Sequence, residues 1–333
     1  MLLVIGPGAV GTVVAGYLSA AGRSVRLLCP ESALPALSAA DEIVIDRVTG
    51  GPPLRAPKPL LTTTVNPERV TQIFICVKQP DLESVCDLIP PALPPSVPLV
   101  SMLNAPSAVH RLRERFPQHT ALPASVLFNA QLLEPFRARV TTVPRIQLPF
   151  EHRQVVESFA GTGIRPVRAF GEASAWGKLL LNLSNAIAAV THSTFRDILS
   201  NPLLRASYAD LLDEAIRVLR AARIPFRAPL PVSLSAYQMM MRHAGALPWW
   251  LARWKWRLAE GAYPSMVSDI AHGRPTEADA LNGEIVRVAA RAGVDAPLNA
   301  KMVTLVEQVG AQRPPRYLSP ADLRSALGHH LQT

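Results

Sequence analysis

The chain has 333 residues, of which 49% are apolar and 18% are charged, and its length is typical of two domains. This composition excludes a disordered chain, and the 32 prolines follow no collagen-like period. The formal net charge of +9 is modest for this length, so a small anionic ligand accounts for it as well as a nucleic acid does.

The cysteine and histidine patterns argue against disulfides and metal sites. The three cysteines form no CxxC pair and leave an odd count, which fits a reducing compartment, so we expect a cytoplasmic protein. The eight histidines form no HExxH or HxxxH pattern, and we expect no metal. No run of 18 apolar residues predicts a membrane span. Residues 1–22 lack a basic start and are interrupted from Gly6 onward, so we expect no signal peptide.

The first elements along the chain predict a βαβ unit. Residues 2–5 are typical of a strand buried on both faces, an apolar helical stretch ends at Gly22, and residues 24–29 form a second strand. A GxGxxG motif opens the helix. Its glycines allow a tight turn, a close approach of the backbone to a pyrophosphate, and close packing of helix and strand, while the helix N-terminus favours phosphates. We therefore predict a dinucleotide site at Gly6, Gly8, Ala9, Val10 and Gly11.

Further buried strands are expected at residues 72–77 and 99–103, and residues 120–150 are expected to add more. Lys78 and Asn104 directly follow the first two of these strands. Ligands of a parallel sheet gather at the carboxyl ends of its strands, so we expect both side chains to lie there.

After Gly171 the pattern becomes helical. The expected helices span residues 173–190, residues 202–223 after an Asn201 cap, residues 276–292 after a Thr276 cap, and a last helix from Pro320 after Ser319. We therefore predict an α/β fold, with an N-terminal Rossmann-type parallel-sheet domain over residues 1–170 and an all-helical C-terminal domain over residues 171–333. No linker separates the two domains, so we expect them to pack directly with a cleft between them.

Polar side chains on the predicted helices leave two interpretations open. Lys178 and Asn182 share one face of an otherwise apolar helix, and Ser265 and Asp269 repeat this spacing on a short helix. Lys178 and Asn182 form either a solvent-facing stripe or part of a site.

The predicted helix start at Thr276 has the same ambiguity. Asp279 is a capping-box-like partner of Thr276, and the helix dipole favours the ionised form of Glu277 by roughly 0.3–1 kcal/mol. Glu277 either complements the helix end or holds a lysine in its charged form.

Taken in order over nearly the whole chain, these segments resemble the ketopantoate reductase (2-dehydropantoate 2-reductase) family. The matching segments are GPGAVG at 6–11, VK at 77–78, LN at 103–104, WGKLLLN at 176–182 and SMVSDIAHGRPTEADALNG at 265–283. The last is the most specific, because it keeps the family's serine, aspartate, TE pair and NG at their usual spacing.

The resemblance implies a Rossmann domain followed by a helical domain, which use NADPH to reduce a 2-oxo acid to the 2-hydroxy acid, a step of pantothenate biosynthesis. It implies that Lys178 is the general acid, and that Glu277 binds substrate and positions the lysine. It further implies substrate contacts from Asn104, Asn182, Asn185 and Ser265, and cofactor contacts from Lys78 and Asn104. The expected partner is a small 2-oxo acid substrate, and we expect binding to neither nucleic acid nor a membrane. A homodimer is one possible assembly.

Several positions depart from the family pattern. Ala186 stands where a second asparagine is usual, Asn185 lies one residue earlier, and Ala105 replaces the glycine after Asn104. Pro30 replaces the arginine expected to bind the 2′-phosphate of NADP.

The acidic Glu31 stands 20 residues after Gly11, where a carboxylate favours NAD, although Arg23 and Arg26 are nearby. NADP is the expected cofactor and NAD the alternative.

Residues 248–257, PWWLARWKWR, mix aromatic and basic side chains. They are typical of amphipathic packing, and alternatives are a membrane-surface helix, a platform for single-stranded nucleic acid, or walls that reshape a substrate pocket. Two further hypotheses for the whole chain stay open: a paralogue acting on another oxo acid, and a nucleotide-binding protein that has lost catalysis.

Overall fold

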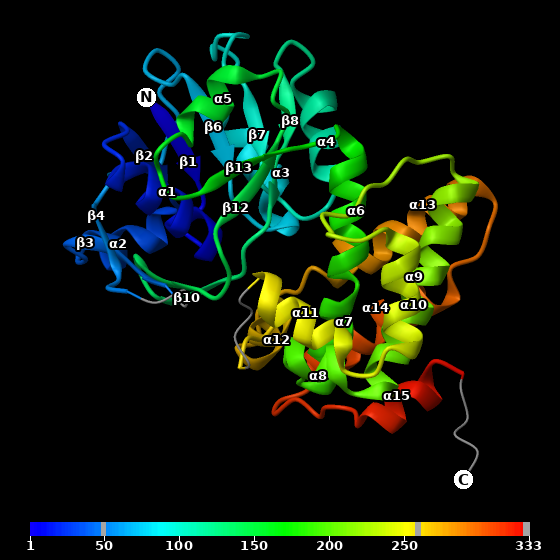
Figure 1. Ribbon diagram of the computed structural model, residues 1–333. Helices are drawn as coiled ribbons and strands as arrows, with labels where there is room; N and C mark the ends of the chain where they lie inside the picture. The colour runs from blue at the N-terminus through cyan, green and yellow to red at the C-terminus, as the bar shows by residue number, and fades with distance from the viewer. Residues whose placement is uncertain (48–50, 257–260, 329–333) are drawn as a thin grey trace. The chain divides into compact units, whose positions relative to one another are not determined.

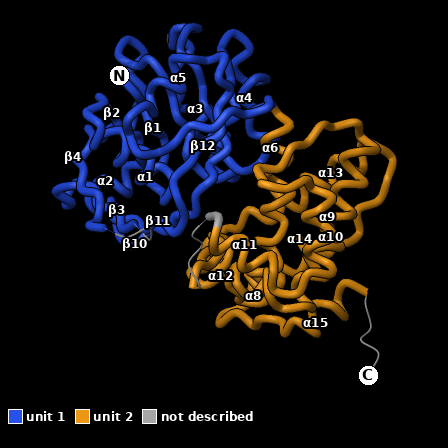
Figure 2. Tube along the Cα trace, viewed as in Figure 1, with its two compact units in different colours: residues 1–171 blue, residues 172–333 orange. Residues whose placement is uncertain are grey.

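The computed structural model of the protein describes residues 1–47, 51–256 and 261–328 (Figure 1). Arg257 of the aromatic-basic stretch therefore lies outside the described residues. The chain divides into two compact units, Met1–Gly171 and Glu172–Thr333 (Figure 2). Within the described residues, no helix combines the length and apolarity needed to cross a membrane.

The first unit is built on a six-stranded sheet in the order β5-β2-β1-β6-β7-β8. All neighbouring strands of this sheet are parallel. In chain order the strands are β1 (Leu2–Ile5), β2 (Val25–Leu28), β5 (Leu60–Thr62), β6 (Gln72–Ile75), β7 (Leu99–Ser101) and β8 (Ala121–Pro123). The chain runs outward from β1 in one direction and then outward from β6 in the other, which is the Rossmann order with its switch point between β1 and β6. The predicted α/β class is confirmed.

Both faces of this sheet are buried, which explains why its strands are continuous apolar runs. Leu2 and Val4 of β1 contribute to the core on one face, and Leu3 and Ile5 contribute to the core on the other. The helices of the unit are α1 (Ala9–Ala20), α2 (Leu34–Ser38), α3 (Leu82–Leu88), α4 (Ser107–Arg115) and α5 (Arg153–Ser158), with the short 3₁₀ turns η1 (Glu31–Ala33) and η2 (Gln79–Asp81).

The strands expected within residues 120–150 are present, but most belong to two smaller sheets. One sheet has the order β10-β11-β3-β4 and contains β10 (Ala130–Glu134), β11 (Arg137–Val140), β3 (Glu42–Arg47) and β4 (Leu54–Pro57). The other has the order β13-β12-β9 and contains β13 (Arg165–Arg168), β12 (Arg145–Leu148) and β9 (Ser125–Val126). The first sheet packs on α1, where a Cβ at Gly16 would lie 2.7 Å from Ile45.

The second unit is helical, and none of its described residues forms a strand. Its helices are α6 (Glu172–Asn182), α7 (Ser184–Thr191), α8 (Phe195–Ser200), α9 (Pro202–Ala221), α10 (Leu234–His243), α11 (Leu247–Trp256), α12 (Ser265–Ala271), α13 (Glu284–Ala292), α14 (Pro297–Ala311) and α15 (Pro320–Ala326). The long helix α9 packs against α10, α13, α14 and α15 and forms the centre of one apolar core.

Several predicted helix ends are confirmed. The Asn201 side chain accepts hydrogen bonds from the amides of Leu203 and Leu204, at 2.9 and 3.2 Å. Ser319 and Asp322 form a capping box at α15, and Gly293 ends α13 in the left-handed conformation.

Two predictions about helices are wrong. The helix expected over 173–190 is two helices, α6 and α7, with Leu183 between them, and just before it the carbonyls of Leu180 and Leu181 accept hydrogen bonds from the Tyr208 hydroxyl at 3.3 and 3.4 Å. The helix expected to begin after Thr276 begins with a π-helical turn, η3 (Asp279–Gly283), with Ala278 at its cap position and no side-chain cap. Asp279 binds Arg287 instead of closing a capping box, because an arginine two turns along offers it a charged partner.

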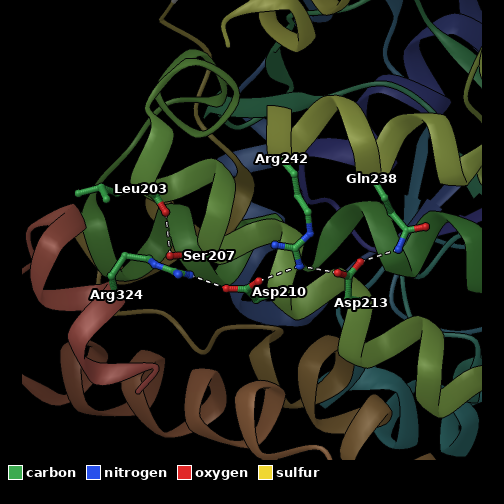
Figure 3. Close-up of polar contacts among 7 residues, drawn as sticks. All are labelled: Leu203, Ser207, Asp210, Asp213, Gln238, Arg242 and Arg324. Carbon is green, nitrogen blue, oxygen red and sulfur yellow. Dashed lines mark hydrogen bonds and ion pairs between the residues drawn. The ribbon is translucent and has the colours of Figure 1, made fainter. Parts of the chain in front are cut away.

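An ion-pair network ties α9 to α10 and α15 (Figure 3). Asp210 of α9 accepts hydrogen bonds from Arg324 of α15 at 2.5 Å and from Arg242 of α10 at 2.9 Å. Arg242 also binds Asp213, which accepts a hydrogen bond from Gln238 at 2.5 Å. The side chains of Asp210 and Arg324 are each only 13% exposed, so this pair is better shielded from water than a surface ion pair.

Candidate functional site

In the first unit, the glycine-rich turn lies between β1 and α1. Gly6 has φ +104°, a conformation that glycine adopts without strain, and its amide donates to the carbonyl of Leu28 at the end of β2. A Cβ at Gly11 would overlap the carbonyl oxygen of Gly6, so only glycine allows α1 to start this close to β1. A Cβ at Gly8 would meet nothing within 4 Å, so the backbone there faces open space at the N-terminus of α1. This geometry fits a pyrophosphate held by amides.

The other candidate residues of this unit follow neighbouring strands of the central sheet. Glu31 follows β2 and is the first residue of η1, Lys78 follows β6, and Asn104 follows β7. Glu31 is exposed, and Lys78 and Asn104 are half-buried. The parallel register of β2, β1, β6 and β7 puts all three at the carboxyl edge, on the same side as the glycine-rich turn.

The two arginines near Glu31 are not at this edge. Arg23 precedes β2 and donates to the carbonyls of Glu157 and Ala160, at 3.2 and 3.1 Å. Arg26 lies in the amino half of β2, opposite Leu3 on one neighbouring strand and Leu60 on the other. Of Arg23, Arg26 and Glu31, only Glu31 lies at the carboxyl end of β2.

The three cysteines belong to the core of this unit rather than to a reactive site. Cys29, Cys76 and Cys86 are all free and buried. Burial raises the pKa of each thiol, which keeps it protonated and unreactive at neutral pH.

In the second unit, Lys178 of α6 interacts with Glu277, which lies just before η3. Lys178 is half-buried, and desolvation lowers the pKa of its ammonium group to about 8, although the carboxylate of Glu277 acts in the opposite direction. Glu277 is itself buried, with 8% of its surface exposed. The structure therefore brings together a lysine and a glutamate far apart in the sequence. A lysine of this pKa gives up its proton readily near neutral pH yet is still mostly protonated there.

The residue before the lysine explains how α6 is held in place. Gly177 packs against the segment between α9 and α10, where any Cβ would overlap the backbone of Arg227 and Ala228. The amide of Arg227 donates to the carbonyl of Ala173 at 2.7 Å. Sequence reasoning did not single out Gly177, although a glycine inside an apolar helix signals a close backbone approach.

The other candidate residues of this unit lie on three helices. Asn182 is the last residue of α6 and is half-buried, while Asn185 is in the first turn of α7 and is 9% exposed. Leu183, between the two helices, keeps right-handed helical dihedrals, and its amide donates to the carbonyl of Leu179 at 3.1 Å. Ser265 begins α12 and is exposed, and α12 packs against α7.

Two further residues of this unit, Ala186 and Asp269, bear on the site. Ala186, at the position where the family usually has asparagine, is fully buried in the apolar core. Asp269 of α12 is 4% exposed and lies 3.4 Å from Arg274.

Two family models match the chain in sequence. Residues 2–150 match the model described as ketopantoate reductase PanE/ApbA, and residues 172–310 match the model for its C-terminal part. The chain belongs to the ketopantoate reductase family. It is thus an oxidoreductase of a family of NAD(P)H-dependent reductases of 2-oxo acids.

Individual relatives are distant. The 2-dehydropantoate 2-reductase of Vibrio cholerae is 26% identical over 319 residues, which cover 90% of this chain and 95% of the relative. A PanE/ApbA family ketopantoate reductase from Ralstonia eutropha JMP134 superposes with a TM-score of 0.75 at 22% identity, covering 93% and 98% of the two chains. D-mandelate dehydrogenase, solved with NADH and anilino(oxo)acetate, superposes with a TM-score of 0.75 at 18% identity, covering 92% and 97%. These likenesses show a shared fold.

Proposed function

We propose that this ketopantoate reductase family member reduces ketopantoate, a 2-oxo acid, to the 2-hydroxy acid, with Lys178 as the general acid. When bound, the reduced nicotinamide supplies the hydride that the carbonyl carbon accepts. Lys178 gives its proton to the carbonyl oxygen, and its positive charge stabilises the alkoxide that develops there. The observation that carries this proposal is the pairing of the half-buried Lys178 with the buried Glu277, in which desolvation lowers the pKa of the lysine to about 8.

The neighbouring polar groups supply binding and orientation. Asn182 and Asn185 carry amides, and Ser265 carries a hydroxyl, that donate to a substrate carboxylate or hydroxyl. Glu277 accepts hydrogen bonds from substrate hydroxyls and holds Lys178 in its charged form. In the first unit, the turn Gly6–Gly11 holds the pyrophosphate, Lys78 lies beside the cofactor, and Asn104 contacts cofactor and substrate.

Removing the lysine tests this assignment directly. We expect Lys178→Ala to lower kcat by about 10³-fold or more, since both proton transfer and alkoxide stabilisation are lost. The assay is the absorbance change at 340 nm with ketopantoate, and calorimetry should give a dissociation constant for the dinucleotide within about two-fold of the unaltered chain. Lys301→Ala, at an exposed position of α14, is the matched control. Unchanged turnover in Lys178→Ala would refute the proposal.

The proposal also predicts a pH dependence. A general acid must be protonated, so kcat for reduction should be constant below the pKa of Lys178 and fall tenfold per pH unit above about 8. The profile is measured with saturating substrate and cofactor from pH 6 to 10. A rate that rises through this range contradicts a lysine acid.

We infer that NADH is the preferred cofactor. The carboxylate of Glu31 at the carboxyl end of β2 accepts hydrogen bonds from ribose hydroxyls and repels a 2′-phosphate. Arg23 and Arg26, the two cations that the sequence leaves as alternatives, are at the amino end and in the amino half of the strand. Lys78 follows β6, two strand spacings or about 10 Å from β2.

Binding measurements test the cofactor preference without turnover. Calorimetry on the unaltered chain should show NADH binding at least about tenfold more tightly than NADPH. Glu31→Gln removes the charge at nearly constant shape and should narrow this ratio, whereas Glu68→Gln, at an exposed loop position beyond β5, should leave it unchanged. Tighter binding of NADPH by the unaltered chain would overturn the preference.

A second candidate function is the reduction of a different 2-oxo acid. The fully buried Ala186 favours it, because this position offers no polar group to a ligand. A panel of aliphatic and aryl 2-oxo acids, assayed beside ketopantoate, decides between the two by kcat/KM.

A further inference from the structure

The π-helical turn η3 separates Glu277 from the regular helix α13. Residues 279–283 form the turn, and α13 follows at Glu284 without a break. A π turn contains one residue more than an α turn, so everything before it is rotated by about 100° relative to a continuous α-helix. The amide of Leu281 donates to the carbonyl of Glu277 at 3.0 Å, which ties Glu277 to the turn. The direction of the Glu277 side chain therefore depends on the turn.

A buried chain of amides and a carboxylate holds the inner side of this turn. Asn282 and Asn299 are both fully buried, and the Asn282 Nδ2 donates to the Asn299 Oδ1 at 3.0 Å. Asn299 donates to the carboxylate of Glu214 through its backbone amide at 2.8 Å and through its Nδ2 at 2.9 Å. The same carboxylate accepts from the amide of Leu298 at 3.0 Å, so Glu214 of α9 also caps α14.

An arginine clasp holds the outer side of the turn. Arg287 donates from one nitrogen to both carboxylate oxygens of Asp279, at 2.9 and 3.0 Å, and from another to the Asp279 carbonyl at 2.9 Å. Its Nε donates to the buried carboxylate of Glu284 at 3.0 Å. A Cβ at Gly283 would overlap the Asp279 carboxylate, so glycine there allows the acid to fold back over the turn.

Within the described residues, the π turn contains a buried polar atom without a hydrogen bond, which lowers the stability of the fold. The Asn282 Oδ1 is buried and accepts no hydrogen bond from the described residues. An unmade hydrogen bond at a buried oxygen costs about 1–3 kcal/mol. π turns are rare and often occur at functional sites, where the surroundings must favour them over the α-helix.

We propose that Asn282 is a positioning residue for the reduction: through its bond to Asn299 it fixes the π turn, and the π turn directs Glu277 toward Lys178. Arg287 has the same role from the outer side of the turn. This inference rests on the proposed roles of Lys178 and Glu277. Neither Asn282 nor Arg287 touches the reacting atoms.

The test is the pH profile of kcat for Asn282→Leu. If the turn relaxes, Glu277 moves away from Lys178, the carboxylate no longer raises the pKa of the lysine, and the decline of kcat moves to lower pH. Misplacement of the pair should also lower the plateau of kcat by about 10- to 100-fold. Thermal stability should change little, because two effects oppose each other. Leucine removes the buried, unpaired Oδ1 of Asn282, but it also leaves the Oδ1 of Asn299 without the hydrogen bond from Asn282.

An exposed variant guards against failure of Asn282→Leu to fold. Arg287→Met removes the clasp at a side chain that is 42% exposed, and we expect the same downward shift with a smaller loss of kcat, partly restored in Arg287→Lys. Loss of a positive charge by itself would raise the pKa of Lys178, so a downward shift reports position rather than charge.

Two controls separate the possible failures. Asp210→Asn weakens the network of Figure 3, so it should lower stability and leave the pH profile unmoved. Glu277→Gln should move the profile downward if the proposed function is right. If Glu277→Gln has no effect, the Lys178–Glu277 mechanism fails. If Glu277→Gln shifts the profile and neither Asn282→Leu nor Arg287→Met does, the positioning role alone is overturned.

Discussion

The two units serve the proposed reaction by different physical means. In Met1–Gly171, the candidate site consists mainly of backbone at the ends of parallel strands, where Gly6, Gly8 and Gly11 leave room for a phosphate and for α1. In Glu172–Thr333, it consists of side chains whose charge is set by burial, above all Lys178 and Glu277. The first kind of site fails when atoms are added to the backbone, and the second fails when a charge loses its partner. The two units should therefore respond differently to substitution.

In the first unit, this difference predicts the largest effect on cofactor binding at Gly11. The Cβ of Gly11→Ala would overlap the carbonyl oxygen of Gly6 and push α1 away from β1. We expect dinucleotide affinity, measured by calorimetry, to fall at least about 100-fold, which is roughly 3 kcal/mol.

The matched control is Gly310→Ala in α14, where a Cβ meets nothing within 4 Å. This change should stabilise the chain by about 0.5–1 kcal/mol and leave dinucleotide affinity unaltered. Equal affinity in Gly11→Ala and the unaltered chain would contradict the assignment of the glycine turn to the cofactor.

Removing both charges of the Lys178–Glu277 pair tests whether the pair stabilises the fold. Lys178→Met alone leaves Glu277 buried without its cation, whereas the double variant Lys178→Met, Glu277→Leu leaves neither charge in place. Replacing a buried ion pair by apolar side chains is often neutral or stabilising by about 1–4 kcal/mol. We expect the double variant to be inactive yet more stable in urea denaturation than either single variant. If the double variant is instead the least stable of the three, the pair stabilises the fold.

The pH dependence of stability provides a related test. Since the folded-state pKa of Lys178 lies near 8, below its usual 10.5, the unfolded chain binds the proton more tightly between these values. The contribution of this group to stability therefore increases as pH rises from about 8 to 10.5 and is lost below that window. The difference in unfolding free energy between the unaltered chain and Lys178→Met, measured by urea denaturation at several pH values, isolates this contribution. A difference that does not change with pH would contradict the lowered pKa.

A smaller effect is expected for the ion-pair network of α9, α10 and α15, on stability and not on function. Asp210→Asn removes a carboxylate that binds both Arg242 and Arg324 (Figure 3). We expect a loss of about 1–2 kcal/mol, since the pair is partly shielded from water, with kcat and dinucleotide affinity unchanged. A drop in kcat at constant stability would mean that this network belongs to the site.

Much of the first unit is predictable because its signals are local. A strand, the glycine motif, a helix and a second strand follow one another within about 30 residues, and the parallel order of the sheet follows from their alternation. Local patterns also predict caps, as at Asn201 and Ser319. The Thr276 prediction failed because its expected partner Asp279 binds Arg287.

The α/β class, the glycine turn and the family can be predicted from the sequence alone, since each depends on residues close together in the chain or on segments in fixed order. Tertiary structure decided how Lys178 meets Glu277 and how far burial lowers the pKa of the lysine, because desolvation depends on atoms from the whole unit. It also decided that Arg23 lies away from the end of β2, and that Asn282 and Asn299 meet in the core. The physical reason is that a motif specifies local backbone geometry, whereas the environment of a charge is set by elements that only folding brings together.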